Sequence, residues 1–171
     1  MAFKIKTISG VDYLSGLIVL HLAINNLTDE VINDLALPNS LVSLDLSYNQ
    51  IVTFNPTIPL PSSLVSLNLY NNQIVIFNPT ISLPNSLVSL NLSYNQIVSF
   101  NPSVPLPNSL EVLFININQM TTAGYTASEP WANAMSIIPS RGNILSTSNV
   151  DSMLGTNLET ILTAKGWTVF P

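Results

Sequence analysis

Short alternations of leucine and polar residues recur along the middle of the chain. Residues 37–56 read LPNSLVSLDLSYNQIVTFNP, and two later blocks repeat this phrase nearly unchanged as LPSSLVSLNLYNNQIVIFNP and LPNSLVSLNLSYNQIVSFNP. In the pattern L-x-L both leucines lie on one face of a β-strand, because side chains alternate across a strand. A single strand cannot bury that face alone. The pattern therefore predicts strands stacked side by side in a parallel sheet over a leucine core.

Equivalent positions of the block lie 23 residues apart. The columns are Leu41, Leu64, Leu87, Leu110; Leu44, Leu67, Leu90, Leu113; Leu46, Leu69, Leu92, Ile115; Asn49, Asn72, Asn95, Asn118; and Ile51, Ile74, Ile97, Met120. An earlier copy, with Leu17, Leu20, Leu22, Asn25 and Leu27, lies 24 residues upstream of the next. This period is typical of repeat architectures.

The block L-x-x-L-x-L-x-x-N-x-L resembles the repeat of the leucine-rich repeat family, and five copies cover Leu17 to about Ala123. The phrase L-P-x-S-L before each strand resembles the short bacterial type of repeat. The resemblance implies an α/β solenoid: a right-handed coil with a parallel sheet on its concave face, a mostly extended convex side and helical C-terminal repeats. It also implies that the concave face contacts the partner.

The second half of each repeat predicts a helix-poor convex side. Eight prolines forbid a long helix there: Pro56, Pro59, Pro61, Pro79, Pro84, Pro102, Pro105 and Pro107. Phe54, Phe77 and Phe100 share one position and are expected to stack. The asparagine column comes where each strand ends and the chain bends inward. Its amides are expected to bond backbone groups that would otherwise be buried without partners, which is a structural role.

The N-terminal end predicts a different start to the stack. Phe3–Ile8 alternates and is expected to form a capping strand. Thr28 is expected to cap a short helix that begins at Asp29 and Glu30, with Val31 and Leu35 facing inward.

After Ala123 the period breaks, and the pattern predicts alternating helices and strands. A helix is expected over TASEPWANAMSII, begun by Ser128 or by a Thr126–Glu129 capping box and ended by Pro139 and Gly142. Its inward face is expected to hold Trp131, Met135 and Ile138. Asn143–Ser146 follows as a strand.

A second helix is expected from the T-x-x-E box of Thr156 and Glu159 to Lys165 and Gly166, with Leu158, Ile161 and Leu162 inward. Trp167–Phe170 is then a last strand. This order continues the parallel sheet with helical crossovers and caps the core. The ending VD..L, helix, KGWTV resembles that of leucine-rich proteins from bacteria and their phages. One domain is expected: residues 1–16 as N-terminal cap, 17–123 as repeats and 124–171 as C-terminal cap.

Composition narrows the classes of function. Among 171 residues only 8% are charged, and the net charge is −5 without a basic cluster, which argues against nucleic-acid binding. The chain has no cysteine and one histidine, so it offers little for a metal or other cofactor, and none is expected. The apolar stretch Leu14–Ala23 is too short to span a bilayer and falls into register with the repeats. We therefore expect no cleaved signal and no membrane insertion, and hence a cytoplasmic or virion-associated protein.

No motif for catalysis stands out, and the chain is expected not to be an enzyme. Asp45 and Glu111 are three repeats apart, too far for a paired-carboxylate device. A hydrolase hidden in the C-terminal segment would have Glu129, Asp151 or Glu159 as candidates. Each of these is better explained as a charge at a helix start.

A binding surface on the concave face is the leading hypothesis. Its candidate contact residues are His21, Val42, Asp45, Tyr48, Val65, Asn68, Tyr70, Val88, Asn91, Tyr94, Glu111 and Phe114. The exposed valine column and the tyrosines are of the kind found at interfaces. The columns repeat Val-Ser-Asn with little variation, which favours a repetitive target or a packing surface. We expect a protein partner, as self-assembly or as part of a phage virion or bacterial surface. The alternative is an adhesin that recognises carbohydrate or protein.

Overall fold

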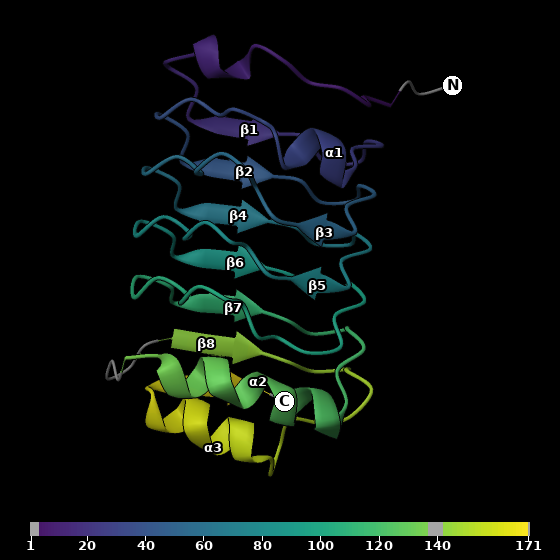
Figure 1. Ribbon diagram of the computed structural model, residues 1–171, viewed down its shortest axis with the longest axis vertical. Coiled ribbons are helices and arrows are strands. Elements are labelled where there is room, and N and C mark those ends of the chain that lie inside the picture. Colours follow the sequence, from purple (N-terminus) through teal and green to yellow (C-terminus); the bar gives the residue numbers. More distant parts are fainter. Residues whose placement is uncertain (1–3, 137–141, 171) are drawn as a thin grey trace.

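A seven-stranded parallel sheet forms the body of the protein. The computed structural model describes residues 4–136 and 142–170 (Figure 1). The strands are β1 (Val19–His21), β2 (Ser43–Asp45), β4 (Ser66–Asn68), β6 (Ser89–Asn91), β7 (Val112–Phe114), β8 (Gly142–Leu145) and β9 (Trp167–Phe170), and they lie side by side in this order. The result is an α/β repeat fold with a mostly parallel sheet and few helices, as the sequence predicts.

The sheet register follows the 23-residue period. Leu20, Leu44, Leu67, Leu90 and Leu113 pair in turn across five strands, and Ile144 and Val169 continue the row. Leu44, Leu67, Leu90 and Leu113 are almost completely buried in one continuous core. The predicted leucine column is therefore confirmed, including its extension into the C-terminal strands.

Each asparagine of the column joins its own repeat to the one before it. In the second repeat, Asn49 Nδ2 donates to the carbonyls of Leu46 (3.0 Å) and Leu22 (2.9 Å), and its Oδ1 accepts the Leu27 amide (3.0 Å). Asn72, Asn95 and Asn118 make the corresponding bonds one, two and three repeats on. The expected structural role of this column is confirmed.

The far side of the middle repeats carries a small second sheet. It consists of β3 (Thr53–Phe54) and β5 (Ile76–Phe77), which pair in parallel. Phe54, Phe77 and Phe100 stack as predicted, with ring centroids 5.8 and 5.7 Å apart. Trp131 closes this column with its ring perpendicular to Phe100 at 4.8 Å.

The N-terminal end differs from the prediction. Lys4–Ile8 forms no strand, while Phe3 lies outside the described residues; the short helical turn η1 (Val11–Tyr13) follows. The segment is attached through Ile5, whose amide donates to Asn25 Oδ1 at 2.9 Å and whose carbonyl accepts the Asn26 amide at 3.1 Å. Helix α1 (Asp29–Ile32) begins after Thr28 as predicted, although the Thr28 side chain makes no capping bond.

Two side chains near α1 have roles that the sequence did not reveal. Ile32 is the buried residue of the helix, while Val31 and Leu35 are only partly buried against the core. The Asp29 carboxylate accepts the amides of Val52 (2.7 Å) and Thr53 (3.1 Å) of the next repeat. It therefore fixes the start of β3 in addition to its place at the helix start.

Helix α2 (Thr122–Ala134) starts earlier than predicted. Its N-cap is Thr121, whose Oγ1 accepts the Gly124 amide (3.2 Å), so Thr126, Ser128 and Glu129 lie inside the helix and none of them begins it. Ser128 is buried instead, and its Oγ accepts the Phe100 amide at 2.8 Å. Trp131 and Met135 are buried as predicted, but α2 ends at Ala134, earlier than predicted, and Met135 follows it. Ile138 and Pro139 lie outside the described residues.

The rest of the C-terminal region agrees closely with the prediction. Helix α3 (Asn157–Ala164) is capped by Thr156, which accepts the Glu159 amide at 3.2 Å, and Gly166 has φ +98°. Strand β9 has the predicted bounds, and β8 starts at Gly142, one residue earlier than predicted. Lys165 has an additional role, because its Nζ donates to the carbonyls of Asn133 (2.9 Å) and Met135 (2.6 Å) at the end of α2.

Candidate protein-binding surface

The outward face of the main sheet changes character along the stack. Two columns of outward side chains run across the strands: Val19, Ser43, Ser66, Ser89, Val112, Asn143, Thr168 and His21, Asp45, Asn68, Asn91, Phe114, Leu145, Phe170. The middle strands present serine with aspartate or asparagine. In the second column the last three strands present large apolar side chains.

The polar side chains in the middle of this face form hydrogen bonds within and between the repeats. Asp45 Oδ1 accepts the Ser47 amide (2.9 Å) and the Asn68 side-chain amide (3.0 Å). Asn68 and Asn91 accept the amides two residues further on in the same way. These predicted contact residues therefore hold the bend after each strand, which leaves them less free to bind a partner.

The predicted valine column is less open than the sequence suggested. Val65 has 36% of its surface exposed, and Val42 and Val88 are half-buried. At the N-terminal end, the exposed His21 lies 3.7 Å from the Asp45 carboxylate of the neighbouring strand (Nδ1 to Oδ2). The carboxylate near His21 thus comes from the adjacent repeat.

Four apolar side chains gather at the C-terminal end of the same face. Val112, Phe114, Leu145 and Phe170 line a cavity of ≈ 380 Å³ together with Asn143. Phe170 is 46% exposed. Glu111 is exposed on the neighbouring position, and its backbone carbonyl accepts the Asn143 amide at 2.7 Å. Among these residues, only Phe114 and Glu111 are contact residues predicted from the sequence.

The positions of Leu145 and Phe170 can be inferred from the sequence once the last two strands are placed in register. Asn143–Ser146 and Trp167–Phe170 are recognisable as strands, and placing them in register with Phe114 brings Leu145 and Phe170 into its column. A column of polar side chains that ends in aromatic and aliphatic groups has the composition of an interface centre.

The three tyrosines come together on the side of the stack, although Tyr70 is shifted by one residue. The ring centroids of Tyr48 and Tyr70 are 5.3 Å apart, and those of Tyr70 and Tyr94 are 4.8 Å apart. Tyr48 and Tyr94 have positive φ values of 55° and 56°; in the repeat between them this conformation falls on Asn71. A side-chain hydrogen bond with Tyr48 and loss of hydration raise the pKa of Tyr70 to about 12.

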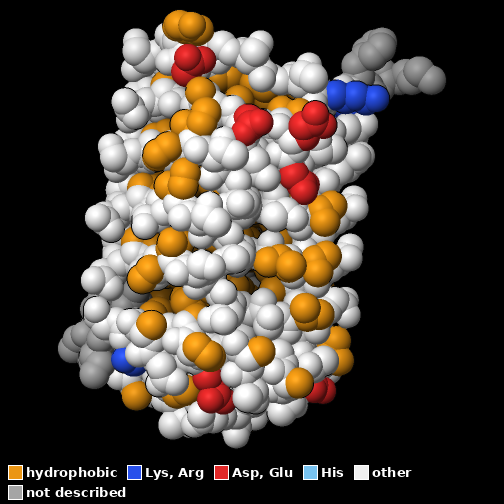
Figure 2. Space-filling model, in the orientation of Figure 1, with side chains coloured by type: hydrophobic (Ala, Val, Ile, Leu, Met, Phe, Trp, Pro, Cys, Tyr) orange, Lys and Arg blue, Asp and Glu red, His pale blue; other side chains and the backbone are white. Residues whose placement is uncertain are grey.

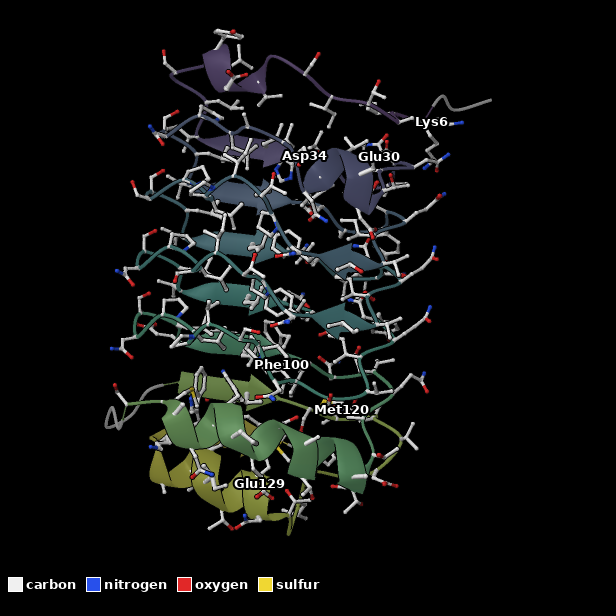
Figure 3. The ribbon with its side chains drawn as sticks, in the orientation of Figure 1. Lys6, Glu30, Asp34, Phe100, Met120 and Glu129 are labelled. Atoms are coloured by element: carbon white, nitrogen blue, oxygen red, sulfur yellow. The ribbon has the colours of Figure 1, made fainter. Side chains whose placement is uncertain are left out.

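Two of the three carboxylates considered for hydrolysis accept backbone amides near a helix start, and the third lies within a helix. Asp151 Oδ2 accepts the Thr122 amide at 2.7 Å, and Glu159 Oε2 accepts the Gly155 amide at 2.6 Å. For these two the helix-start explanation agrees with the structure. It is wrong for Glu129, which lies within α2 (Figure 3).

A polar cleft of ≈ 800 Å³ lies at the N-terminal end, between the first residues and α1. Lys6, Glu30 and Asp34 line it (Figure 3). The Asp34 carboxylate already has a hydrogen-bond partner, because its Oδ1 accepts the Thr57 hydroxyl at 2.7 Å. The described residues contain no group of three or more metal-ligating side chains. Within the same residues, no helix has the length and apolar character needed to cross a membrane.

These features define an α/β repeat protein with a mostly parallel sheet and few helices. A family model described as Leucine Rich Repeat matches residues 40–61 and 86–113. The chain therefore contains leucine-rich repeats. Repeats of this family generally mediate protein–protein interaction and are typically non-enzymatic. No curated protein matches the chain.

Proposed function

We propose that this chain is a non-enzymatic module that binds a protein through the C-terminal end of its outward sheet face. The partner inserts an apolar side chain between Phe114, Leu145 and Phe170. The single observation that carries this proposal is the change from a serine and asparagine face to a cluster of apolar groups around a cavity of ≈ 380 Å³. Phe170 is exposed and Val112, Phe114 and Leu145 are half-buried, so the cluster is a partly open apolar group on an otherwise polar face, as is found at contact sites.

The polar groups around the cluster complement its role. Asn143 offers a side-chain amide that can both donate and accept, and Glu111 supplies a negative charge beside it. An apolar centre with a polar rim is the usual arrangement of a specific interface. The remaining predicted contacts on the sheet, from His21 to Asn91, form the outer part of this surface in the proposal, and Tyr48, Tyr70 and Tyr94 lie on the side of the stack.

The wider architecture supports the same role. In the proposal, residues 17–123 form a right-handed solenoid, residues 1–16 cap its start, and α2 and α3 cap its other end. Helix α2 begins two residues before the proposed boundary at 124. The module acts inside an assembly, such as a phage virion or a bacterial surface; support for this origin is limited to the resemblance of the repeats and of the C-terminal ending.

An adhesin that binds carbohydrate is the second candidate. The observation that favours it is the ribbon of Tyr48, Tyr70 and Tyr94, because aromatic rings with polar tips suit contacts with sugars. A glycan array compares the wild type with the triple alanine variant of these tyrosines. Tyrosine-dependent binding supports the adhesin, and its absence removes it.

Selection from a displayed random peptide library tests the leading proposal. Selected peptides are expected to share an aromatic or leucine anchor and to lose at least about tenfold in affinity on Phe114→Asn/Phe170→Ser. Ile76→Ser, which removes an exposed apolar group from the other sheet, is the matched control and should change nothing. Peptides that bind the double variant as well as the wild type would contradict the proposal.

A further inference from the structure

The middle of the chain contains no charged residue at all. Residues 46–110 include no Asp, Glu, Lys, Arg or His. All thirteen charged residues lie outside this stretch: Lys4, Lys6, Asp12, Asp29, Glu30, Asp34 and Asp45 before it, and Glu111, Glu129, Arg141, Asp151, Glu159 and Lys165 after it. In Figure 2 the middle of the face shown carries no acidic or basic side chain. Two copies of this acidic chain therefore repel each other least at the middle repeats.

One side of this uncharged stretch exposes most of its large apolar groups. We call it the Tyr–Gln–Val flank, defined as three rows: Tyr48, Gln50, Val52; Tyr70, Gln73, Val75; and Tyr94, Gln96, Val98. Backbone bonds hold the rows side by side, from Gln73 N to the Ile51 carbonyl (2.9 Å) and from Gln96 N to the Ile74 carbonyl (2.9 Å).

The side chains of the flank project outward because they alternate with buried ones. Asn49 and Ile51 are buried, while Tyr48, Gln50 and Val52 are exposed. Val52, Val75 and Val98 are 42%, 37% and 49% exposed, and Ile76 beside them is 58% exposed. Figure 2 shows hydrophobic side chains along the right-hand side at the level of β3 and β5, with acidic side chains above them. This apolar strip lies away from the outward sheet face.

The sequence of the flank matches a two-fold contact. Residues 46–52 and 92–98 are identical, both LSYNQIV, whereas the repeat between them reads LYNNQIV at residues 69–75. A two-fold axis at the middle row places the first row of one copy against the identical third row of the other, and the middle row against itself. Glutamine amides and tyrosine hydroxyls both donate and accept, so identical rows can satisfy each other.

We infer that a second copy of this chain docks on the Tyr–Gln–Val flank in an antiparallel, two-fold arrangement centred on Gln73. The rows in contact carry no charged side chain, and the half-buried Asp29 carboxylate, which accepts the Val52 amide, lies at the edge of the first row. Three short rows are a small interface, so the dimer forms and dissociates readily with concentration. The flank is separate from Phe114 and Phe170, and the inference does not depend on the peptide-binding proposal.

Analytical ultracentrifugation from about 10 μM to 1 mM tests the inference. Wild type is expected to shift from monomer to dimer, and raising the salt from about 0.1 to 0.5 M should leave the dimer unchanged or strengthen it, since only repulsion is screened. Gln73→Lys and Gln73→Glu should each weaken association at least about tenfold, because the axis brings like charges together. Gln73 is exposed, so both variants should keep the wild-type circular dichroism spectrum and melting temperature.

Mixing the two variants is the decisive measurement. An equimolar mixture of Gln73→Lys and Gln73→Glu should restore dimers, as heterodimers, because the axis then brings two opposite charges together at position 73. Asn85→Lys adds the same charge as Gln73→Lys to an exposed position of the uncharged stretch outside the flank, and it should associate like wild type. A wild type that stays monomeric at about 1 mM, equal effects of Gln73→Lys and Asn85→Lys, or no recovery in the mixture would each overturn the inference. Peptide binding at Phe114 reports separately on the proposed function.

Discussion

The middle repeats and the C-terminal region build the same sheet by different means. Between β2 and β7 the chain returns through extended segments, and asparagine side chains bond the backbone of neighbouring repeats. Between β7 and β9 it returns through α2 and α3, and individual contacts such as Lys165 Nζ to the Asn133 carbonyl join the pieces. The register Leu113, Ile144, Val169 nevertheless continues unbroken.

This difference shows which part of the repeat determines the register of the sheet. The inward residue of each strand fixes the register, and the crossover behind it can be a coil or a helix. Near-identical crossovers give a uniform exterior, as on the Tyr–Gln–Val flank. Where the crossovers become irregular, side chains such as Phe114, Leu145 and Phe170 differ from those at the equivalent position of the preceding repeats. The candidate binding cluster lies at the start of this irregular region.

The largest expected effect comes from the core of the middle repeats. Leu67→Ala should lower the free energy of unfolding by about 2–5 kcal/mol, because Leu67 is fully buried between the equivalent leucines of its neighbours. Urea unfolding followed by circular dichroism measures it. The matched control is Val65→Ala on the outward face of the same repeat, which should cost much less. Equal losses for the two variants would mean that the leucine column is not the common core.

A glycine at the junction of the two regions gives the next effect. A Cβ on Gly124 of α2 would collide with the Val98 carbonyl of the last middle repeat. Gly124→Ala should therefore destabilise the protein by about 3 kcal/mol, although alanine favours an isolated helix. Ala123 is exposed in the same helix, and Ala123→Gly should cost only about 1 kcal/mol from helix propensity. Thermal or urea unfolding of both variants measures the difference. Stabilisation by Gly124→Ala would show that α2 does not lie against the repeats this closely.

The smallest effect is a pH dependence confined to alkaline solution. Burial raises the pKa of Tyr125 to about 12, and its hydroxyl donates to the Asp151 carbonyl at 2.9 Å. The folded protein holds this proton above the ordinary tyrosine pKa of about 10, so the stabilisation is complete below a pH of about 10 and is lost as the pH rises through about 12. The loss should be on the order of 2 kcal/mol by urea unfolding. In Tyr125→Phe the decline over this range should be shallower by that amount, and an equally steep decline would contradict the assignment.

Much of the fold could be predicted because the repeat supplies its own alignment. The positions of Leu67, Asn72 and Phe77 follow from the period alone, since each has an equivalent one repeat away. Thr156, Glu159 and Gly166 carry local capping signals that need no tertiary information. The start of α2 was missed because Thr121 is a weak signal, Gly124 disfavours a helix, and the stabilising Asp151 lies 29 residues away.

The candidate site was harder to predict than the fold. Apolar alternation at the N-terminus suggested a strand, yet Lys4–Ile8 is held by hydrogen bonds of Ile5 with Asn25 and Asn26 instead, and no pattern in one segment reveals such partners. Phe114 stood out as an outward-facing aromatic residue in a polar column. Leu145 and Phe170 needed the register of β8 and β9, which the irregular lengths of the helical crossovers conceal.

The asparagine ladder has a consequence for how such a chain can change its length over evolution. Every rung bonds its own turn and the preceding one through the same atoms, so excising or duplicating one 23-residue unit of the gene would leave each remaining amide with an equivalent neighbour. The two dissimilar ends would be carried along intact. Variants with fewer or additional 23-residue units, produced by recombination between the near-identical repeats, should therefore still fold.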